Sequence, residues 1–152
     1  MQISADKKET LQKLVSWYKA GPRTQYITLG GYAGTGKTTL IGIFRSLIHS
    51  HNPQVKVGFI SYTGKATRVL KNKLGEFGAL QKGDSVSTIH SLIYSPIINN
   101  KEEIIGWQKR DEIDKDFLII DEGSMLDEEI WLDLLSYNKP IFAVGDHGQL
   151  PP

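Results

Sequence analysis

The sequence predicts an α/β fold in which a parallel sheet is covered by helices on both faces. Short, nearly continuous apolar runs that read as buried strands alternate with longer segments of helical periodicity. A glycine-rich segment joins the first of these strands to the helix that follows it. The chain has 152 residues, of which 39% are hydrophobic and 23% charged, and this composition suits a single domain with one core.

The expected elements follow one another along the chain without an internal repeat. An amphipathic helix is expected over residues 4–20, where apolar residues recur at helical spacing before Gly21 and Pro22. Strands are expected at 26–30, 55–62, 117–120 and 140–144, and helices at 38–48 and 65–74. Residues 96–116 are polar around Ile104, Ile105 and Trp107, which suits a small hairpin or an excursion from the main sheet.

Composition excludes several classes of protein. No apolar run approaches the roughly 18 residues that a membrane span requires, and the N-terminus lacks an apolar signal region. We therefore expect no membrane partner and a cytoplasmic location. The chain has no cysteine, which excludes disulfides and thiolate metal sites. Its net charge of +1 does not by itself indicate a nucleic-acid binder, so such a function must rest on motifs.

The strongest motif is GYAGTGKTT, residues 31–39, which has the G-x-x-x-x-G-K-T spacing of a phosphate-binding loop. Glycines let backbone N–H groups face the phosphates, and the helix N-terminus adds partial positive charge. Lys37 would reach the β- and γ-phosphates, while Thr38 would offer its hydroxyl to Mg²⁺. A glycine turn that merely ends a strand is the alternative, but the position between strand and helix favours nucleotide binding. The candidate nucleotide-binding residues are Gly31, Ala33, Gly34, Thr35, Gly36, Lys37, Thr38 and Thr39.

A second motif, LIIDEGS at residues 118–124, supplies the acids that a phosphate-binding loop needs. The apolar strand delivers Asp121 to its C-terminal end, where α/β sheets bind their ligands. Asp121 would orient the water shell of Mg²⁺, and Glu122 would reach the water that attacks the γ-phosphorus. A solvated strand end is the alternative for such a pair alone. Beside the phosphate-binding loop, the pair favours an ATPase over a kinase, although these residues do not identify the base.

Four segments in this order resemble motifs Ia, Ib, II and III of superfamily 1 DNA helicases, in the RecD-like and Dda-like branch that moves 5′ to 3′. They are SYTGKATRVL, STIHSLIY, IIDEGSMLD and AVGDHGQLPP. The resemblance covers essentially the whole chain and is most specific in GDHGQLPP. It implies a RecA-like motor domain, 1A, over residues 1–152, and a monomer that uses ATP and Mg²⁺. A second RecA-like domain, absent from this chain, would close the ATP cleft, and single-stranded DNA would cross the top of both.

The same resemblance implies roles for individual residues. Gln149 matches the motif III glutamine that contacts the γ-phosphate, and Asp146 supports it on the same segment. The implied catalytic residues are Lys37, Asp121, Glu122 and Gln149, and the implied metal ligands are Thr38 and Asp121. The implied DNA-backbone contacts are Thr63, Gly64 and Lys65 in motif Ia and Thr88 and His90 in motif Ib. Their hydroxyls, glycine N–H and lysine suit phosphates rather than base edges.

The segment from about 94 to 115 would be a small 1B insertion that carries a strand-separating pin. Trp107 fits either the pin tip or the hairpin's own core. Other basic residues that follow Lys65 suit a solvated helix face, namely Arg68, Lys71 and Lys73. His90 also fits a core histidine bonded to a carbonyl.

Two positions depart from the family pattern. Lys7 stands where the family often has a glutamine that reads adenine, which puts adenine selection in doubt. Tyr62 stands where motif Ia commonly has proline; a tyrosine there would stack on a base or pack against the sheet.

Two other functions stay open. One is a P-loop ATPase or small-molecule kinase without a nucleic-acid partner, and the other is a module that binds nucleotide or DNA without turnover. The family meets transition-state charge with arginines from the second motor domain, which are worth on the order of 10³ to 10⁵ in rate in related enzymes. We therefore expect the 152-residue chain to bind nucleotide weakly and to hydrolyse it slowly.

Overall fold

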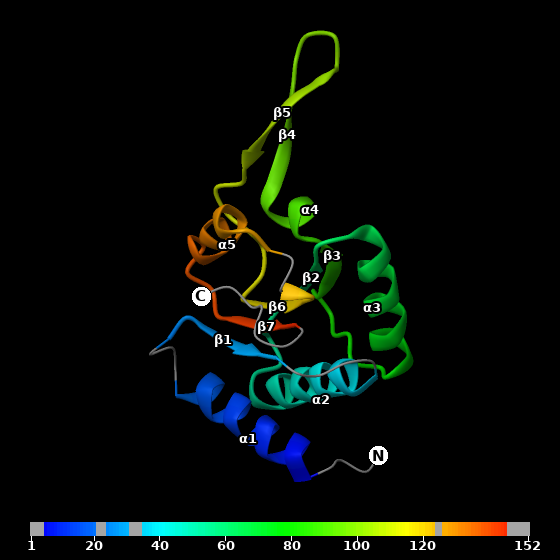
Figure 1. The fold of residues 1–152 in the computed structure, drawn as a ribbon, viewed down its shortest axis with the longest axis vertical. Helices are drawn as coiled ribbons and strands as arrows, with labels where there is room; N and C mark the ends of the chain where they lie inside the picture. Colours follow the sequence, from blue (N-terminus) through cyan, green and yellow to red (C-terminus); the bar gives the residue numbers. More distant parts are fainter. Residues whose placement is uncertain (1–4, 21–23, 31–34, 124–125, 146–152) are drawn as a thin grey trace.

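A five-stranded parallel sheet forms the centre of the computed structural model, which describes residues 5–20, 24–30, 35–123 and 126–145 (Figure 1). The strand order is β1-β7-β6-β2-β3. The strands are β1 (Tyr26–Leu29), β2 (Val57–Ser61), β3 (Ser85–Thr88), β6 (Phe117–Asp121) and β7 (Ile141–Val144). All neighbouring pairs in this sheet are parallel, which confirms the predicted fold class.

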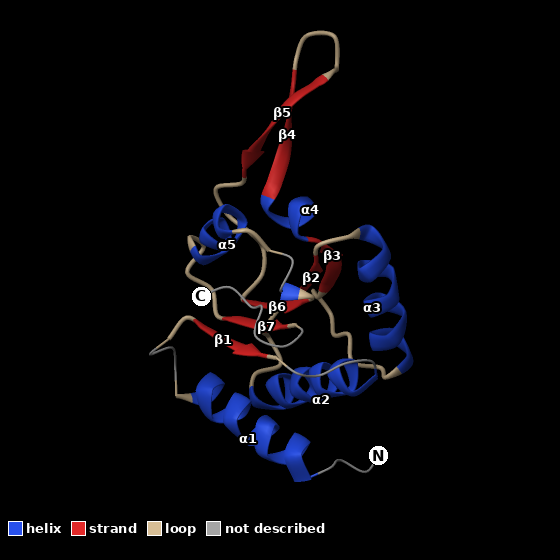
Figure 2. Cartoon of the chain, viewed as in Figure 1, coloured by secondary structure: helices blue, strands red, loops and turns tan. Residues whose placement is uncertain are grey.

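Helices cover both faces of this sheet, as Figure 2 shows. They are α1 (Ala5–Lys19), α2 (Thr35–His51), α3 (Gly64–Glu76), α4 (Ile89–Ile93) and α5 (Glu128–Leu135). One apolar cluster joins α1, α2 and α3 to one face of the sheet, and a second joins α4 and α5 to the other. The sequence located the helix of 4–20 and the strands β1, β2, β6 and β7, but it did not predict β3. It placed the second helix at 38–48, whereas α2 is longer at both ends.

The central strand β6 shows why the sequence runs are continuously apolar. Phe117 and Ile119 belong to the cluster on the α2 face, whereas Leu118 and Ile120 belong to the cluster on the α5 face. All four are buried, because successive side chains of a strand point to opposite faces and both faces are covered. The same alternation directs the next side chain, Asp121, toward the α2 face.

A buried ion pair fixes α2 to the sheet. Arg45 Nε lies 2.8 Å from Asp84 Oδ2 and Nη2 lies 3.0 Å from Oδ1, and neither side chain is more than 1% exposed. The Asp84 carboxylate also accepts hydrogen bonds from the backbone N–H groups of Val57 and Gln81. Arg45 therefore holds the helix that begins at the phosphate-binding loop against the start of β2.

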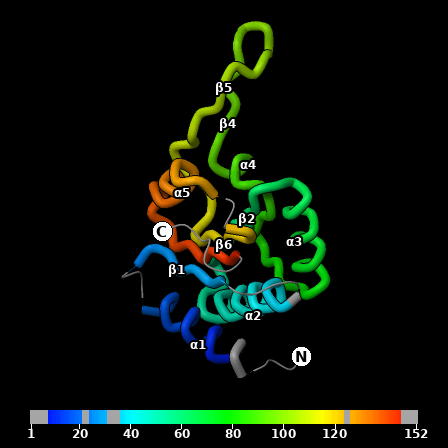
Figure 3. The backbone as a smooth tube through the Cα atoms, viewed as in Figure 1, coloured from blue at the N-terminus to red at the C-terminus, as the bar shows by residue number. Residues whose placement is uncertain are grey.

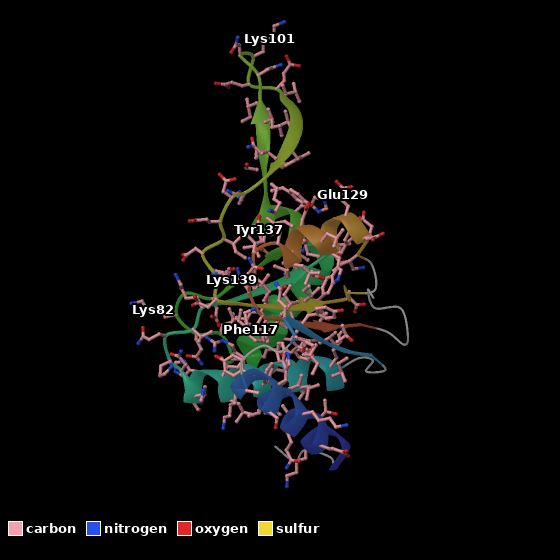
Figure 4. All side chains as sticks on the ribbon, turned by 90° about the vertical axis from the view of Figure 1, so that its left-hand side faces the viewer. Lys82, Lys101, Phe117, Glu129, Tyr137 and Lys139 are labelled. Carbon is pink, nitrogen blue, oxygen red and sulfur yellow. The ribbon has the colours of Figure 1, made fainter. Side chains whose placement is uncertain are left out.

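The expected excursion from the sheet is an antiparallel hairpin of β4 (Tyr94–Ile98) and β5 (Ile104–Lys109). It projects well beyond the body of the chain (Figure 3), and Figure 4 shows Lys101 at its tip, far from Phe117 in the core. Tyr94 Oη anchors the root by donating to Asp133 of α5 at 2.5 Å. Five large apolar side chains of the hairpin are exposed: Ile97, Ile98, Ile104, Ile105 and Trp107.

Candidate functional site

The candidate site lies at the carboxyl edge of the sheet, where β6 ends. Asp121 is the last residue of β6, and its side chain is only 10% exposed. Glu122 follows with a φ of 60°, a left-handed conformation that costs a non-glycine residue free energy. This sharp change of direction at Glu122 ends the strand at Asp121, so the two adjacent carboxylates lie at the strand end.

Lys37 of α2 makes direct contact with both acids. Its Nζ lies 2.7 Å from Asp121 Oδ1 and 2.5 Å from Glu122 Oε1, which accepts a hydrogen bond. The contact with Asp121 lies off the direction of a hydrogen bond, so it is an ion pair that leaves the hydrogen-bonding capacity of Oδ1 unused. The fold thus brings together residues that are 85 positions apart in the sequence, as the two motifs predict.

Burial and the ion pair act on these groups in opposite directions. Burial disfavours the ammonium form of Lys37, but its close contacts with Asp121 and Glu122 and the charges of these two acids outweigh burial, so the pKa of Lys37 lies above its usual value. Burial raises the pKa of Asp121 above that of an ordinary aspartate, although Lys37 pulls this pKa down. Lys37 is therefore cationic, and its charge favours the ionised form of Asp121.

A pocket of about 390 Å³ opens between these groups and α3. Predicted residues of the phosphate-binding loop, motif II and motif Ia all line it, namely Lys37, Thr38, Asp121, Glu122, Thr63 and Lys65. The half-buried Lys73, which the sequence assigned to a solvated helix face, also lines it. Its spacing was the available signal, because Lys65, Val69 and Lys73 follow one another at four-residue intervals, and residues four apart are neighbours on a helix surface.

Two threonines that the sequence predicts as DNA contacts are N-terminal caps of helices in the structure. Thr63 Oγ1 accepts from the N–H of Ala66 at 3.1 Å, at the start of α3, and Thr88 Oγ1 accepts from Ser91 at 3.2 Å, at the start of α4. Each hydroxyl still has its own proton to donate. Gly64 and Lys65 are exposed on the first turn of α3. Motif Ia begins at the end of β2 and motif Ib at the end of the neighbouring parallel strand β3, so both lie at the same edge of the sheet.

His90 is exposed, so the alternative of a core histidine is wrong. Its ring lies 6.2 Å from that of Tyr62 and 5.3 Å from that of Tyr94. Tyr62 is half-buried and packs against the apolar cluster of the α5 face. A second pocket of about 290 Å³ is lined by His90, Tyr94 and Trp107, so the structure separates motif Ib from the pocket that holds Lys37.

Several predicted residues lie outside the described part of the chain. These are Gly31, Ala33, Gly34, Asp146 and Gln149. Gly36 and Thr39 lie in the first turns of α2, and Thr35 is its first residue. The roles predicted for all of these residues stay predictions.

The sequence matches the protein family described as AAA domain over residues 18–152. The chain belongs to this AAA domain family. Its curated relatives place this AAA domain among the RecD-like motor domains of superfamily 1 helicases. It is 36% identical over 136 residues to the RecBCD enzyme subunit RecD of Buchnera aphidicola, covering 80% of the chain and 22% of the relative. It is 35% identical over 132 residues to the ATP-dependent RecD2 DNA helicase of Deinococcus radiodurans, covering 83% and 16%.

One further relative and one solved structure are similar to the chain. The ATP-dependent DNA helicase dda of Enterobacteria phage T4 is 31% identical over 136 residues, covering 86% of this AAA domain and 29% of that protein. A solved structure of Pif1 helicases at forked double-stranded DNA shares the fold with a TM-score of 0.59 at 19% identity, covering 100% of this chain and 35% of that one. The chain thus spans between 11% and 29% of the length of the curated relatives it matches.

The residues of this AAA domain fit a metal ion that a nucleotide brings with it. Among the described residues, no group of three or more His, Cys, Asp or Glu side chains is placed to hold a metal alone. Thr38 and Asp121 are both buried in the pocket, and Oδ1 of Asp121 has an unused hydrogen-bonding position. A hydroxyl, a carboxylate and phosphate oxygens are the ligands that Mg²⁺ prefers.

No described helix is long and apolar enough to cross a membrane.

Proposed function

We propose that this AAA domain is the ATP-binding motor domain of a DNA helicase, which couples Mg-ATP hydrolysis to movement along single-stranded DNA and to duplex unwinding. One observation carries the proposal: Lys37 of the phosphate-binding loop touches both Asp121 and Glu122 in one pocket. A lysine for phosphates, an acid for the metal's waters and an adjacent acid for the attacking water are the parts that nucleotide hydrolysis needs.

The charges of the pocket explain why the nucleotide would bind with Mg²⁺. Lys37 and its two carboxylate partners carry a charge of about −1 at the centre of the pocket, and Lys65 and Lys73 bring its whole lining to about +1. The lysines therefore attract the phosphates, and a cation is needed where the phosphates approach the two carboxylates. When phosphates enter, Lys37 exchanges its carboxylate partners for phosphate oxygens, and Thr38 and Asp121 are placed to hold Mg²⁺. A Mg²⁺ ion held by these two residues would neutralise charge on the phosphate oxygens. Glu122, which keeps 32% of its side chain exposed, then accepts a proton from the attacking water.

The DNA-contacting surface would begin beside this pocket. The N-termini of α3 and α4 follow β2 and β3 and present Thr63, Lys65 and His90 at exposed or half-buried positions. Hydroxyls, backbone N–H groups and a lysine bind phosphates without reading sequence. In the same proposal, residues 94–115 are the 1B insertion, and the projecting β4–β5 hairpin is its strand-separating pin.

The remainder of the motor would lie outside this chain. The chain spans between 11% and 29% of its curated relatives, which supports a second RecA-like domain elsewhere in the whole protein. That domain would supply the arginines that stabilise charge on the γ-phosphate. Movement from 5′ to 3′, which the resemblance of the motifs to the RecD-like and Dda-like branch implies, is part of the same proposal. A monomeric state and a cytoplasmic location belong to the same proposal.

Titrations with a fluorescent ATP analogue and with a labelled single-stranded oligonucleotide test this function. We expect nucleotide binding that requires Mg²⁺, and oligonucleotide binding whose log K falls as log salt rises. Glu122→Gln is expected to keep nucleotide affinity while removing the residual turnover. Mg²⁺-dependent nucleotide binding without any oligonucleotide affinity would instead support an ATPase that has no nucleic-acid partner. Rapid DNA-stimulated hydrolysis by the 152-residue chain would contradict the need for a second domain.

A further inference from the structure

We propose that Ser61 is a positioning residue of this site, whose hydroxyl orients Asp121 and a water molecule of the metal's hydration shell. The proposal rests on the proposed function, because it concerns the same nucleotide-bound metal. Ser61 is the last residue of β2 and the first residue of the motif Ia segment SYTGKATRVL, but the motifs assign it no role.

The sheet places Ser61 directly beside Asp121. The two residues are register partners on the neighbouring parallel strands β2 and β6. Val57 and Phe59 of β2 belong to the cluster on the α2 face, so strand alternation turns Ser61 to that face. Asp121 points to the same face, because it contacts Lys37 of α2. Adjacent strands lie roughly 4.8 Å apart, so the hydroxyl and the carboxylate are close neighbours.

The hydroxyl of Ser61 has a hydrogen-bonding capacity that the fold leaves unused. Ser61 is 0% exposed, and its Oγ has no hydrogen-bond partner in the described part of the chain. Oδ1 of Asp121 likewise has no hydrogen-bond partner in the described part of the chain, since its contact with Lys37 is an ion pair without hydrogen-bond geometry. Two buried oxygens without a hydrogen bond therefore belong to register partners on neighbouring strands. Buried polar atoms usually have a partner in the functional state, because an unsatisfied one costs free energy.

A purely space-filling role does not explain the hydroxyl. The preceding inward positions of β2 on this face are Val57 and Phe59, and an alanine would fill the space of Ser61 without burying an unpaired polar atom. The residue also stands two positions before Thr63, which lines the pocket with Asp121. Partners of this kind, which hold a metal ligand rather than the metal, set ligand orientation and metal affinity.

Mn²⁺ binding to the ADP-loaded chain, followed by electron paramagnetic resonance, tests the proposal. We expect Ser61→Ala to weaken Mn²⁺ affinity by about 10-fold to 100-fold, the range typical for loss of such a partner. ADP affinity without metal should not change. Ser85→Ala is the matched control, because Ser85 Oγ is also buried without a partner but lies at the first residue of β3, at the opposite edge of the sheet. Its Mn²⁺ affinity should equal that of the unaltered chain.

Denaturant unfolding in the absence of metal separates this role from a structural one. Removal of an unpaired buried hydroxyl should leave the unfolding midpoint of Ser61→Ala unchanged or raise it. A lowered midpoint would show that the hydroxyl bonds within the fold and would overturn the proposal, as would Mn²⁺ affinity equal to that of the unaltered chain. If the unaltered chain bound no Mn²⁺-ADP, the proposed function itself would fail, which is a different result.

Discussion

Replacement of Lys37 by methionine is expected to destabilise the nucleotide-free protein as well as to abolish nucleotide binding. Methionine keeps most of the apolar stem and removes only the ammonium, so the effect reports on charge. Asp121 and Glu122 share the Lys37 ammonium in the unaltered chain, and in the variant these two carboxylates would lie close together without a positive charge between them. The Asp121 side chain is only 10% exposed and so cannot recover its hydration.

The magnitude follows from the contacts. At about 2.6 Å and an effective dielectric constant of about 20, each lysine–carboxylate pair has a gross attraction of roughly 6 kcal/mol. Most of this attraction offsets the desolvation of the buried groups, and loss of one partner from a buried pair typically costs about 3–5 kcal/mol. Glu122 keeps 32% of its side chain exposed, so water screens its charge. We therefore expect a loss at the lower end, about 3 kcal/mol in the free energy of unfolding at neutral pH.

The pH dependence gives the prediction a sign. Burial raises the pKa of Asp121 and Lys37 opposes that rise, so the pKa rises further in Lys37→Met. A carboxyl whose pKa is raised in the folded state costs nothing where it is protonated in both states. Its cost grows as pH rises from the unfolded-state pKa to the folded-state pKa and stays constant above both. The stability difference between Lys37→Met and the unaltered chain should therefore be larger at pH 8 than at pH 5.

Urea unfolding followed by circular dichroism measures this difference. The double variant Lys37→Met/Asp121→Asn is the control, because it also removes the unpaired buried charge and should recover most of the lost stability. A Lys37→Met protein that unfolds at the same urea concentration as the unaltered chain would refute the electrostatic account of this site. An equal loss in the double variant would refute it too, since the cost would then come from packing.

Two further predictions concern the contacts that support the site. Asp84→Ala leaves the fully buried Arg45 without its counter-charge and should lower the free energy of unfolding by about 3–5 kcal/mol, whereas Asp116→Ala, which removes an exposed acceptor of the Lys56 N–H, should cost less than about 1 kcal/mol. Equal losses in urea unfolding would contradict the special role of the buried pair. Tyr94→Phe removes the bond to Asp133 at the hairpin root and should cost about 1–3 kcal/mol and speed amide hydrogen exchange in β4 and β5. Burial and then Asp133 raise the pKa of Tyr94, so the bond should survive a pH at which ordinary tyrosines ionise; loss of this protection at such a pH would count against it.

The sequence predicted the main elements and the centre of the site because both depend on local patterns. Continuous apolar runs identify strands buried on both faces, and parallel strands carry the residues that follow them to one edge. Lys37, Asp121 and Glu122 could therefore be expected to meet from two motifs alone.

What the sequence did not reveal depends on tertiary contacts between ordinary residues. Arg45 and Asp84 are 39 positions apart, and nothing in their local sequence marks them as a buried pair. Ser61 becomes conspicuous only when the register of β2 and β6 places it beside Asp121. Thr63 and Thr88 were interpreted from motifs as DNA contacts, but the structure adds a local task for each, because their side-chain oxygens start helices.

The register of β2 on β6 also has a mechanical consequence for the proposed motor. The strand that ends in Asp121 and the strand that leads into Thr63 and Lys65 are hydrogen-bonded neighbours. One strand spacing of roughly 4.8 Å separates Asp121 from its register partner Ser61, which stands two residues before Thr63, the first residue that would hold DNA. No other strand lies between β6 and β2 in the sheet. A displacement of a few tenths of an ångström at the γ-phosphate would reach the start of α3 almost undiminished, because a fully buried, close-packed strand has little room to absorb it.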